Sequence, residues 1–485
     1  MNPRNISVFL IASLLLMFGI TFLSEGHVVK EGEEEDGFMV FDQVVKYPTT
    51  ETFMMAGKVE HPNTESIDSI VANIAQVVVE EEAPEEAVKE PVVDYRKIDT
   101  SRIKRMDWPA NKQEVIAKLK KQLSSGNCRI IHYGDSQLEG DRISAYVRNR
   151  LQGIYGGEGP GFVPVKQLYH QLKAKVTPSE NWLRFAAFDP KHEKFDHKKY
   201  GAFTSVSRFT PYIHKDSVSL DTIEVTEASI AVAVAPTRYK RLRKFTHVDL
   251  HYGHAQTPLS IEVYQKDSLI KKDSFPADLS YHKYRIDLKT PPKDLKIVMR
   301  SKISPDFYGL TLDGDKGIAL DNVAMRGASG TVFRKLDREN FNAMIRELDP
   351  KVFIFQYGGN SVPYMKTEEA IDRYVKYVMS NVSWVRRMRA DASVIFIGPS
   401  DMSTLQDGNY VSYKHLPYLN NKLREACVTN GIAYWSMFEA MGGANAMQHW
   451  VDQELAKSDY THFSSSGTKV ISELFFTALS LDLNE

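Results

Sequence analysis

The sequence predicts an α/β domain built around a parallel sheet, with an antiparallel β-sandwich inserted into it. Two observations carry this prediction. After about residue 100, short apolar runs bounded by glycine or polar residues recur, with helical stretches between the later ones, which is typical of buried parallel strands. Between the first and second of these runs, the chain instead shows short, alternating, β-branched segments separated by turn residues.

Residues 1–25 have the pattern of an export segment. Arg4 precedes an apolar run from Ile6 to Leu23 that holds no charge, as in a secretory signal. This run is also close to the shortest length that crosses a bilayer, so a cleaved signal peptide and an uncleaved membrane anchor both stay open. In either case we expect the rest of the protein to work outside the cytoplasm, in the periplasm or anchored to the membrane.

Residues 26–98 are predicted to form a flexible linker. This segment contains the acidic runs "KEGEEEDG" and "EEEAPEEAVKEP", scattered prolines and no sustained apolar period. A chain of this composition buries too little apolar surface to offset the entropy lost on folding. A short helix at 66–79 is the only regular element that the pattern suggests here.

The predicted parallel domain occupies residues 99–174 and 317–485. Its strands are expected at 128–134, 317–325, 352–358, 393–399 and 431–436. Its helices are expected at 141–156, 331–348, 366–389 and 418–430. Because a helix lies between successive later strands, these strands run parallel and the helices cover both faces of the sheet.

The predicted inserted domain occupies residues 175–316. Alternating segments are found at 228–235, 247–253, 259–265, 284–289 and 295–300. Gly, Pro, Asp or Lys turns separate these segments, as in an antiparallel sandwich whose strands each present one face to the core. The insertion therefore separates the first parallel strand from the second.

Charge and cysteine content exclude several classes of function. The chain has 61 Lys+Arg and 62 Asp+Glu, a net charge of -1, which gives no global attraction for nucleic acid or for an anionic membrane. The two cysteines, Cys128 and Cys427, form neither a disulfide framework nor a metal-ligand cluster. We therefore expect no metal and no cofactor.

Three polar residues suggest nucleophilic catalysis. Ser136 lies between the first strand and the helix that follows it, where a serine is commonly a helix cap. Near the C-terminus, Asp459 and His462 are three residues apart, just before a predicted helix. At this spacing the carboxylate can orient the imidazole, which can then take a proton from a serine hydroxyl.

Two further positions fit an oxyanion hole. Asn360 follows a buried strand after two glycines, at the edge where parallel sheets bind ligands, and its amide can donate to an oxyanion. Gly327 and Gly330 follow another strand, so a backbone N–H at this turn is a second candidate donor. Taken singly, each of these features is also an ordinary turn.

Together, these features resemble the SGNH/GDSL hydrolase family in both order and position. The resemblance covers residues 125–174 and 317–482 and is carried by Gly134, Asp135, Ser136, Gly330, Asn360, Asp459 and His462. It implies a flavodoxin-like, three-layer parallel sheet. It also implies Ser136 as nucleophile, His462 as general base and Asp459 as the residue that orients it. The implied oxyanion hole comprises the N–H groups of Ser136 and Gly330 and the Asn360 side chain.

Two positions depart from the family pattern. Gln137 stands where a leucine often follows the serine, and Ser361 stands where an acidic residue often follows the asparagine. Neither position is required chemically, so the departures concern the subfamily. The chain also lacks the G-x-S-x-G elbow of α/β-hydrolases.

The stretch 433–450 and the inserted β domain resemble peptidoglycan O-acetylesterases. This resemblance implies removal of acetyl groups from a glycan, most specifically peptidoglycan, and an insertion similar to a carbohydrate-binding module. O-acetyltransfer, deacetylation of another polysaccharide and non-catalytic glycan binding stay open. Trp435 and Trp450 are either core residues or platforms for a sugar face.

Overall fold

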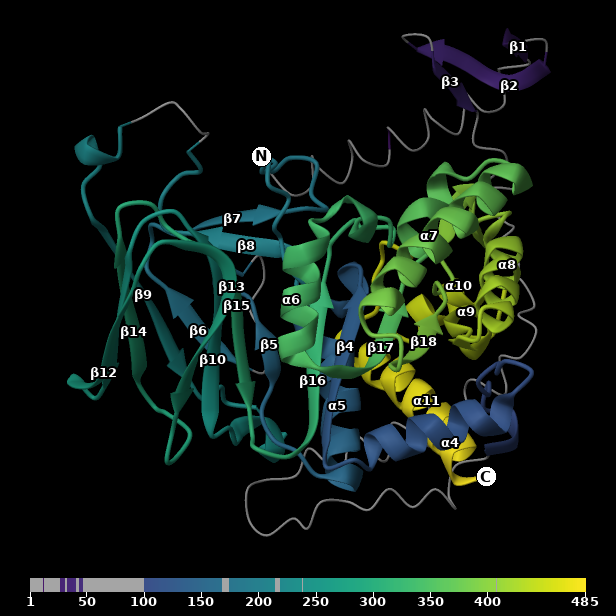
Figure 1. Ribbon diagram of the computed structural model, residues 1–485. Helices are drawn as coiled ribbons and strands as arrows, with labels where there is room; N and C mark the ends of the chain where they lie inside the picture. The colour runs from purple at the N-terminus through teal and green to yellow at the C-terminus, as the bar shows by residue number, and fades with distance from the viewer. Residues whose placement is uncertain are drawn as a thin grey trace. The chain divides into compact units, whose positions relative to one another are not determined.

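The structure, a computed structural model, describes five long segments of the chain (Figure 1). They are residues 100–167, 174–213, 219–237, 239–406 and 408–485, and nearer the N-terminus residue 12 and the strands within 27–46. The predicted export segment and most of the predicted linker lie outside the described residues. In the described segments, no helix combines the length and the apolar character needed to cross a membrane.

Three short strands form a sheet inside the segment that the sequence predicts as a flexible linker. They are β1 (His27–Lys30), β2 (Glu33–Val40) and β3 (Gln43–Lys46), paired antiparallel in the order β1-β2-β3. Each of β1 and β3 contains two consecutive valines, a residue type that favours the extended backbone. At these positions the structure therefore differs from the flexible linker that the composition predicted.

A five-stranded parallel sheet forms the centre of the α/β domain. Its strands are β4 (Asn127–Gly134), β16 (Gly317–Ala324), β17 (Pro350–Gln356), β18 (Ser393–Ile397) and β21 (Ala433–Trp435). Their spatial order is β16-β4-β17-β18-β21, with every neighbouring pair parallel. The first strand thus lies between the second and the third, which is the flavodoxin-like order that the family resemblance implied.

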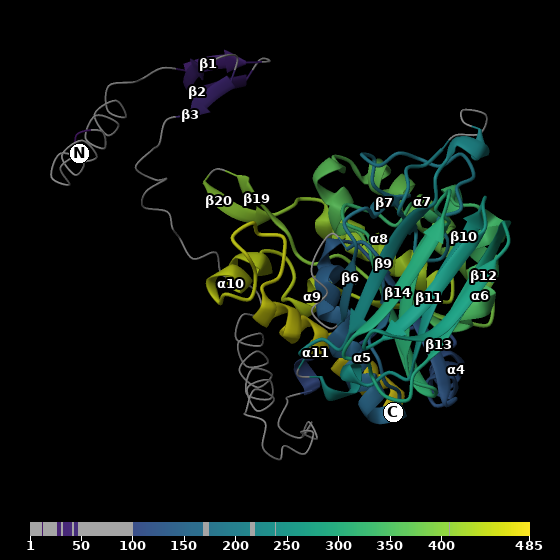
Figure 2. The same cartoon turned by 90° about the vertical axis from the view of Figure 1, so that its left-hand side faces the viewer.

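Helices cover both faces of this sheet, as Figures 1 and 2 show. One face carries α4 (Lys112–Leu123), α5 (Arg142–Tyr155), α9 (Met437–Ala440), α10 (Ala446–Asp452) and α11 (Ser465–Asn484). The other face carries α6 (Arg338–Leu348), α7 (Glu368–Met388) and α8 (Leu416–Thr429). Successive strand residues point to opposite faces, so Ile130 packs in the first core and Ile131 in the second.

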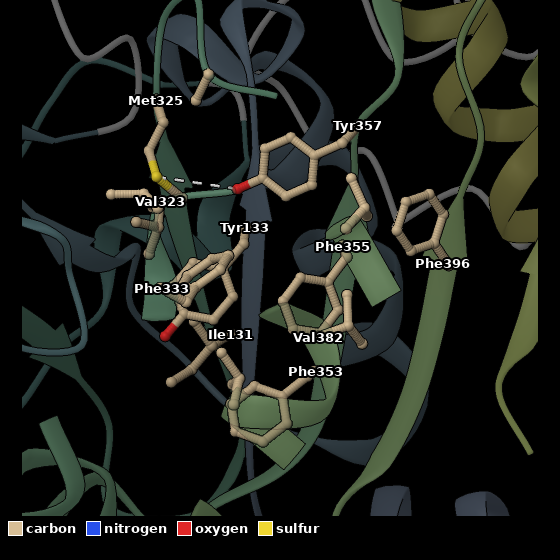
Figure 3. Packing of buried hydrophobic residues seen from close by; sticks show 14 of the residues in the cluster. Ile131, Tyr133, Val323, Met325, Phe333, Phe353, Phe355, Tyr357, Val382 and Phe396 are labelled. Carbon is tan, nitrogen blue, oxygen red and sulfur yellow. Dashed lines mark hydrogen bonds between the residues drawn. The ribbon is translucent and has the colours of Figure 1, made fainter. Parts of the chain in front are cut away.

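An aromatic cluster fixes the end of β4, just before the predicted nucleophile (Figure 3). The ring of Tyr133 lies 5.0 Å from that of Phe333, edge to face, and 5.6 Å from that of Phe355, stacked. Its hydroxyl donates a hydrogen bond of 2.9 Å to the carbonyl of Ala202, in the inserted region. The strand end is thus packed against the α/β core and hydrogen-bonded to the inserted region.

Two antiparallel sheets form the sandwich. The first contains β5 (Gly161–Val163), β7 (Leu183–Ala186), β8 (Ser205–Arg208), β10 (His247–Ala255), β13 (Asp278–Asp287) and β15 (Asp306–Asp313). The second, whose strands lie side by side in Figure 2, contains β6 (Lys175–Pro178), β9 (Thr226–Ala233), β11 (Leu259–Gln265), β12 (Ser268–Phe275) and β14 (Leu295–Ser301). Their inner faces share one apolar core, which includes Leu250 and Ile261.

Both tryptophans that the sequence left open are core residues. Trp435 and Trp450 are almost completely buried. Their indole N–H groups donate to the carbonyls of Lys104 and Met441, at 3.1 and 3.0 Å. Neither ring offers a face to a sugar.

A separate hairpin is formed by β19 (Ser403–Gln406) and β20 (Asn409–Ser412).

Candidate active site

Ser136 lies in the first turn after β4, where a short 3₁₀ segment, Ser136–Asp141, begins. The cap of this segment is Asp135, whose Oδ1 accepts a 2.9 Å hydrogen bond from the Gln137 N–H. The Ser136 hydroxyl is therefore not used as the cap. A Cβ at position 134 would lie 2.6 Å from the Cδ1 of Leu138, so a larger residue there would displace the buried Leu138 side chain.

The structure brings Ser136, His462 and Asp459 into one hydrogen-bonded chain. The Oγ of Ser136 lies 3.0 Å from Nε2 of His462, and Nδ1 of His462 lies 2.9 Å from Oδ2 of Asp459. The other carboxylate oxygen accepts the N–H groups of Thr461 and His462, at 3.0 and 2.9 Å. This is the geometry in which a carboxylate orients an imidazole that faces a serine hydroxyl.

Asp459 is a partly exposed member of this chain. Its side chain is 48% exposed and that of His462 is 33% exposed. Partial burial raises the pKa of Asp459, but the hydrogen bonds from His462 and Thr461 outweigh this effect and leave the pKa below its ordinary value. The carboxylate form is thus stabilised at neutral pH.

Gln137 connects the serine turn to the histidine loop. Its Nε2 donates a 2.8 Å hydrogen bond to the carbonyl of Thr461, the residue before His462. The sequence marked this position only as a departure from the family pattern. The presence of glutamine where leucine is common was the one sign in the sequence that this residue has a role. Its partner Thr461 lies 324 residues away, so no local pattern could identify it.

Asn360 lies in the short 3₁₀ segment Gly359–Tyr364, after β17, and lines the same cavity as Ser136. Its Nδ2 donates to Oδ2 of Asp135 at 3.2 Å and to the carbonyl of Ala328 at 3.1 Å. Both amide hydrogens therefore have acceptors. To donate to an oxyanion, this side chain has to exchange one of these bonds.

Asp135 is the buried acid of the site. Burial raises its pKa to about 6, against the lowering effects of the Gln137 N–H and of the His462 charge. Together with Asn360, this carboxyl group joins the loops that follow β4, β16 and β17. The sequence assigned Asp135 no separate role.

Gly330, the residue that the resemblance implied as a backbone donor, lies in a tightly packed turn. Its backbone has a φ of +76°, and a Cβ there would lie 2.8 Å from the ring of Tyr357. Glycine at this position is thus required by close packing as well as by conformation. Of the described residues that line the cavity, none is Gly330. A tight turn, closed by a 3.0 Å bond from the Ala328 N–H to the Met325 carbonyl, precedes it.

A small cavity of about 50 Å³ opens beside Ser136 and His462. Pro399, Met402 and Met437 supply apolar parts of its lining. A cavity of this volume holds only a few water-sized groups. It can therefore accommodate a short acyl group, whereas a long acyl chain needs more room. In the described segments, no group of three His, Cys, Asp or Glu side chains is placed to hold a metal ion.

The sheet order β16-β4-β17-β18-β21, with helices on both faces, and the separate antiparallel sheets confirm the predicted fold class, a flavodoxin-like three-layer α/β domain with an inserted sandwich. The chain shares this fold with a solved structure described as a peptidoglycan O-acetylesterase. The TM-score is 0.59 at 19% sequence identity, and the match covers 78% of this chain and 99% of that chain.

Other comparisons add little. A putative GDSL-like lipase from Bacteroides ovatus ATCC 8483 is 11% identical over 64% of this chain and 98% of its own, with a TM-score of 0.26. An active-site mutant of a family two carbohydrate esterase from Clostridium thermocellum is 10% identical over 62% and 98%, also with a TM-score of 0.26. Scores of this size do not establish a shared fold. No family model and no curated protein matches the sequence.

Proposed function

We propose that this protein is an exported serine esterase that removes O-acetyl groups from a glycan, and that the glycan is peptidoglycan. The observation that carries the proposal is the Ser136–His462–Asp459 chain beside a cavity of about 50 Å³. These three hydrogen-bonded residues supply a nucleophile with its base, and the cavity selects a short acyl group.

The proposed reaction has two steps. In the first, Oγ of Ser136 attacks the acetyl carbonyl carbon while its proton passes to Nε2 of His462, and the sugar oxygen then leaves with that proton. In the second, water attacks the acetyl-serine and gives a proton to His462. The serine oxygen then leaves, regains the proton, and acetate is released. Asp459 orients the imidazole throughout.

The negative charge on the carbonyl oxygen needs hydrogen-bond donors. The N–H of Ser136 is one proposed donor, and Asn360 is another if it releases the carbonyl of Ala328. An oxyanion is a stronger acceptor than a neutral carbonyl, which favours this exchange as charge develops. The turn that leads to Gly330 is the proposed source of a third donor.

Substrate and location rest on different observations. Peptidoglycan is proposed because the structure that shares the fold is described as a peptidoglycan O-acetylesterase. Export is proposed because residues 1–25 have the pattern of a secretory signal or anchor. The sandwich is proposed to hold the glycan while the α/β domain acts on its acetyl group.

Acetate release from O-acetylated peptidoglycan and from acetylated xylan tests this proposal. The detergent-solubilised full chain is compared with Ser136→Ala and with Ser125→Ala, an exposed serine before β4, as matched control. We expect release from peptidoglycan that Ser136→Ala abolishes and Ser125→Ala retains. Release from xylan alone would overturn the substrate assignment.

Labelling with a fluorophosphonate separates the remaining alternatives. If acetate is not released but Ser136 is labelled, the site is reactive and O-acetyltransfer to a sugar hydroxyl replaces hydrolysis. If Ser136 is neither labelled nor required for acetate release, the esterase proposal is wrong and non-catalytic glycan binding replaces it.

A further inference from the structure

A second and larger cavity, of about 430 Å³, lies beside β7 in the sandwich and is also lined by Pro211 and Tyr212, which follow β8. Its lining includes Lys166, Arg184, Glu193 and Tyr212. The mechanism proposed above uses none of these residues. The volume is sufficient for part of a sugar chain or its substituent.

Arg184 is the unusual residue of this cavity. Among the described residues, its Nε and Nη1 have no hydrogen-bond acceptor although both atoms are buried. The guanidinium carbon lies 5.8 Å from the centre of the Phe188 ring, so the cation has an aromatic neighbour. Burial lowers its pKa to about 10, and it stays charged at neutral pH. The charges of Asp189 and Glu139 stabilise the cation in part, but neither carboxylate accepts a hydrogen bond from Nε or Nη1. Buried N–H groups without acceptors are costly, and an anionic ligand would supply those acceptors.

The other charges around the cavity also favour an anion. Lys166 donates to the carbonyl of Trp182 through one ammonium hydrogen, which leaves the charge of the side chain unneutralised by that contact. His192 accepts the Ala186 N–H at Nδ1 (3.0 Å), and burial lowers its pKa, so it is neutral. Of the described lining residues, two are therefore cationic and one, Glu193, is anionic.

The cavity borders an apolar cluster that extends from the sandwich into the α/β domain. Phe185, next to Arg184 on β7, belongs to the same apolar cluster as Tyr357 and Val362, which flank Asn360 in sequence. The charge of Asp189 and, more weakly, that of Glu139, three residues after the predicted nucleophile, also act on Arg184. The effect of the Glu139 charge on Arg184 is the observation that connects this cavity with the surroundings of Ser136.

We propose that this cavity binds a carboxylate carried by the glycan strand, with the Arg184 guanidinium as its main donor and Lys166 as a second cation. As a substrate subsite, it rests on the proposed esterase function. A carboxylate has the planar geometry that accepts two parallel N–H bonds from arginine. The carboxylate is expected on a peptide attached to the sugar or on a uronic acid residue.

Isothermal titration of the full chain carrying Ser136→Ala tests the proposal without turnover. The probes are N-acetylmuramoyl-L-alanyl-D-isoglutamine, a glucuronic acid-substituted xylo-oligosaccharide and neutral chitobiose. We expect one of the two carboxylated probes to bind and chitobiose to bind at least tenfold more weakly. The probe that binds identifies the source of the carboxylate.

The variant Arg184→Gln is expected to weaken that binding about tenfold or more. The matched control, Lys296→Gln, removes one charge from an exposed position on β14 and is expected to bind as the parent does. The melting temperature of Arg184→Gln is expected to stay at or above that of the parent, because the Nε and Nη1 groups that the substitution removes make no hydrogen bond to the described residues. A lower melting temperature would indicate a structural role for Arg184 and would overturn the proposal.

Equal binding of all three probes, no binding of either carboxylated probe, or unchanged binding in Arg184→Gln would also overturn the carboxylate site. Hydrolysis of p-nitrophenyl acetate by the unsubstituted chain is measured in parallel. If hydrolysis depends on Ser136 while carboxylates do not bind, the carboxylate site fails and the esterase function stands. If carboxylates bind through Arg184 but no ester is hydrolysed, the esterase function fails and the anion site remains.

Discussion

The substitution Asp459→Asn tests the orienting role of this carboxylate. Three N–H groups converge on it: Nδ1 of His462, the His462 backbone and the Thr461 backbone. A carboxylate accepts all three, with two bonds on one oxygen and one on the other. An asparagine has a single acceptor oxygen, so it cannot serve the backbone donors and the imidazole together.

The structure also sets the size of the effect. If the asparagine oxygen keeps the two backbone bonds, its NH₂ faces Nδ1 of His462 and favours the tautomer that carries its proton on Nε2. That tautomer cannot take the proton of Ser136. Losing a hydrogen bond to a charged group costs about 1.5–3 kcal/mol. With the cost of the mismatched donor added, we expect the activation free energy to rise by about 2–4 kcal/mol, which lowers the rate by about 30- to 1000-fold. The effect stays below that of a buried triad because Asp459 is 48% exposed and water can replace part of its contacts.

Turnover of p-nitrophenyl acetate at neutral pH measures this loss, with circular dichroism as a check on folding. The variant Asp459→Ala is the companion, because it removes the carboxylate without placing a donor against the imidazole. We expect Asp459→Asn to be at least as slow as Asp459→Ala. If Asp459→Asn retained more than about a third of the parent kcat, the orienting role would be refuted.

The remaining predictions concern the groups around the serine and the cavity. Replacing Gln137 by leucine removes the bond to Thr461, so kcat is expected to fall about tenfold with little change in KM; an unchanged kcat would show that the bond does not position His462. Asn360→Ala is expected to lower kcat by about 10² to 10³, and a near-normal rate would remove it from the oxyanion hole. Acetyl p-nitrophenyl ester should be cleaved much faster than the butyryl ester, because the cavity is only about 50 Å³; flat or rising rates with chain length would contradict this. Burial raises the pKa of Asp135 to about 6, so the folded state holds this proton more tightly than the unfolded state and the contribution of Asp135 to stability falls as the pH rises from about 4 to about 6. The fall is on the order of 3 kcal/mol, and urea unfolding should show a flatter pH dependence for Asp135→Asn; an equal slope in both proteins would refute this assignment.

Local patterns in the sequence were sufficient to predict the architecture. Hydrophobic periodicity and the placement of glycines, which are patterns over a few residues, predict strand ends such as Gly134 and connecting helices such as 366–389. The parallel direction of the strands and the two helical layers then follow from connectivity, whereas the flavodoxin-like strand order was implied by the family resemblance. The order of the four motifs along the chain also indicated which loops meet, because parallel strands end at a common edge.

The finer contacts of the site depend on residues far apart in the chain, and only the tertiary structure decided them. The bond from Gln137 to Thr461, the use of both Asn360 amide hydrogens and the packing of Gly330 on Tyr357 involve partners on different elements. The same holds for Arg184, which the sequence shows as one more arginine in a β-rich region. The physical reason is that the burial of a side chain and its hydrogen-bond acceptors depend on which elements pack together. The local periodicity of the sequence does not determine that packing.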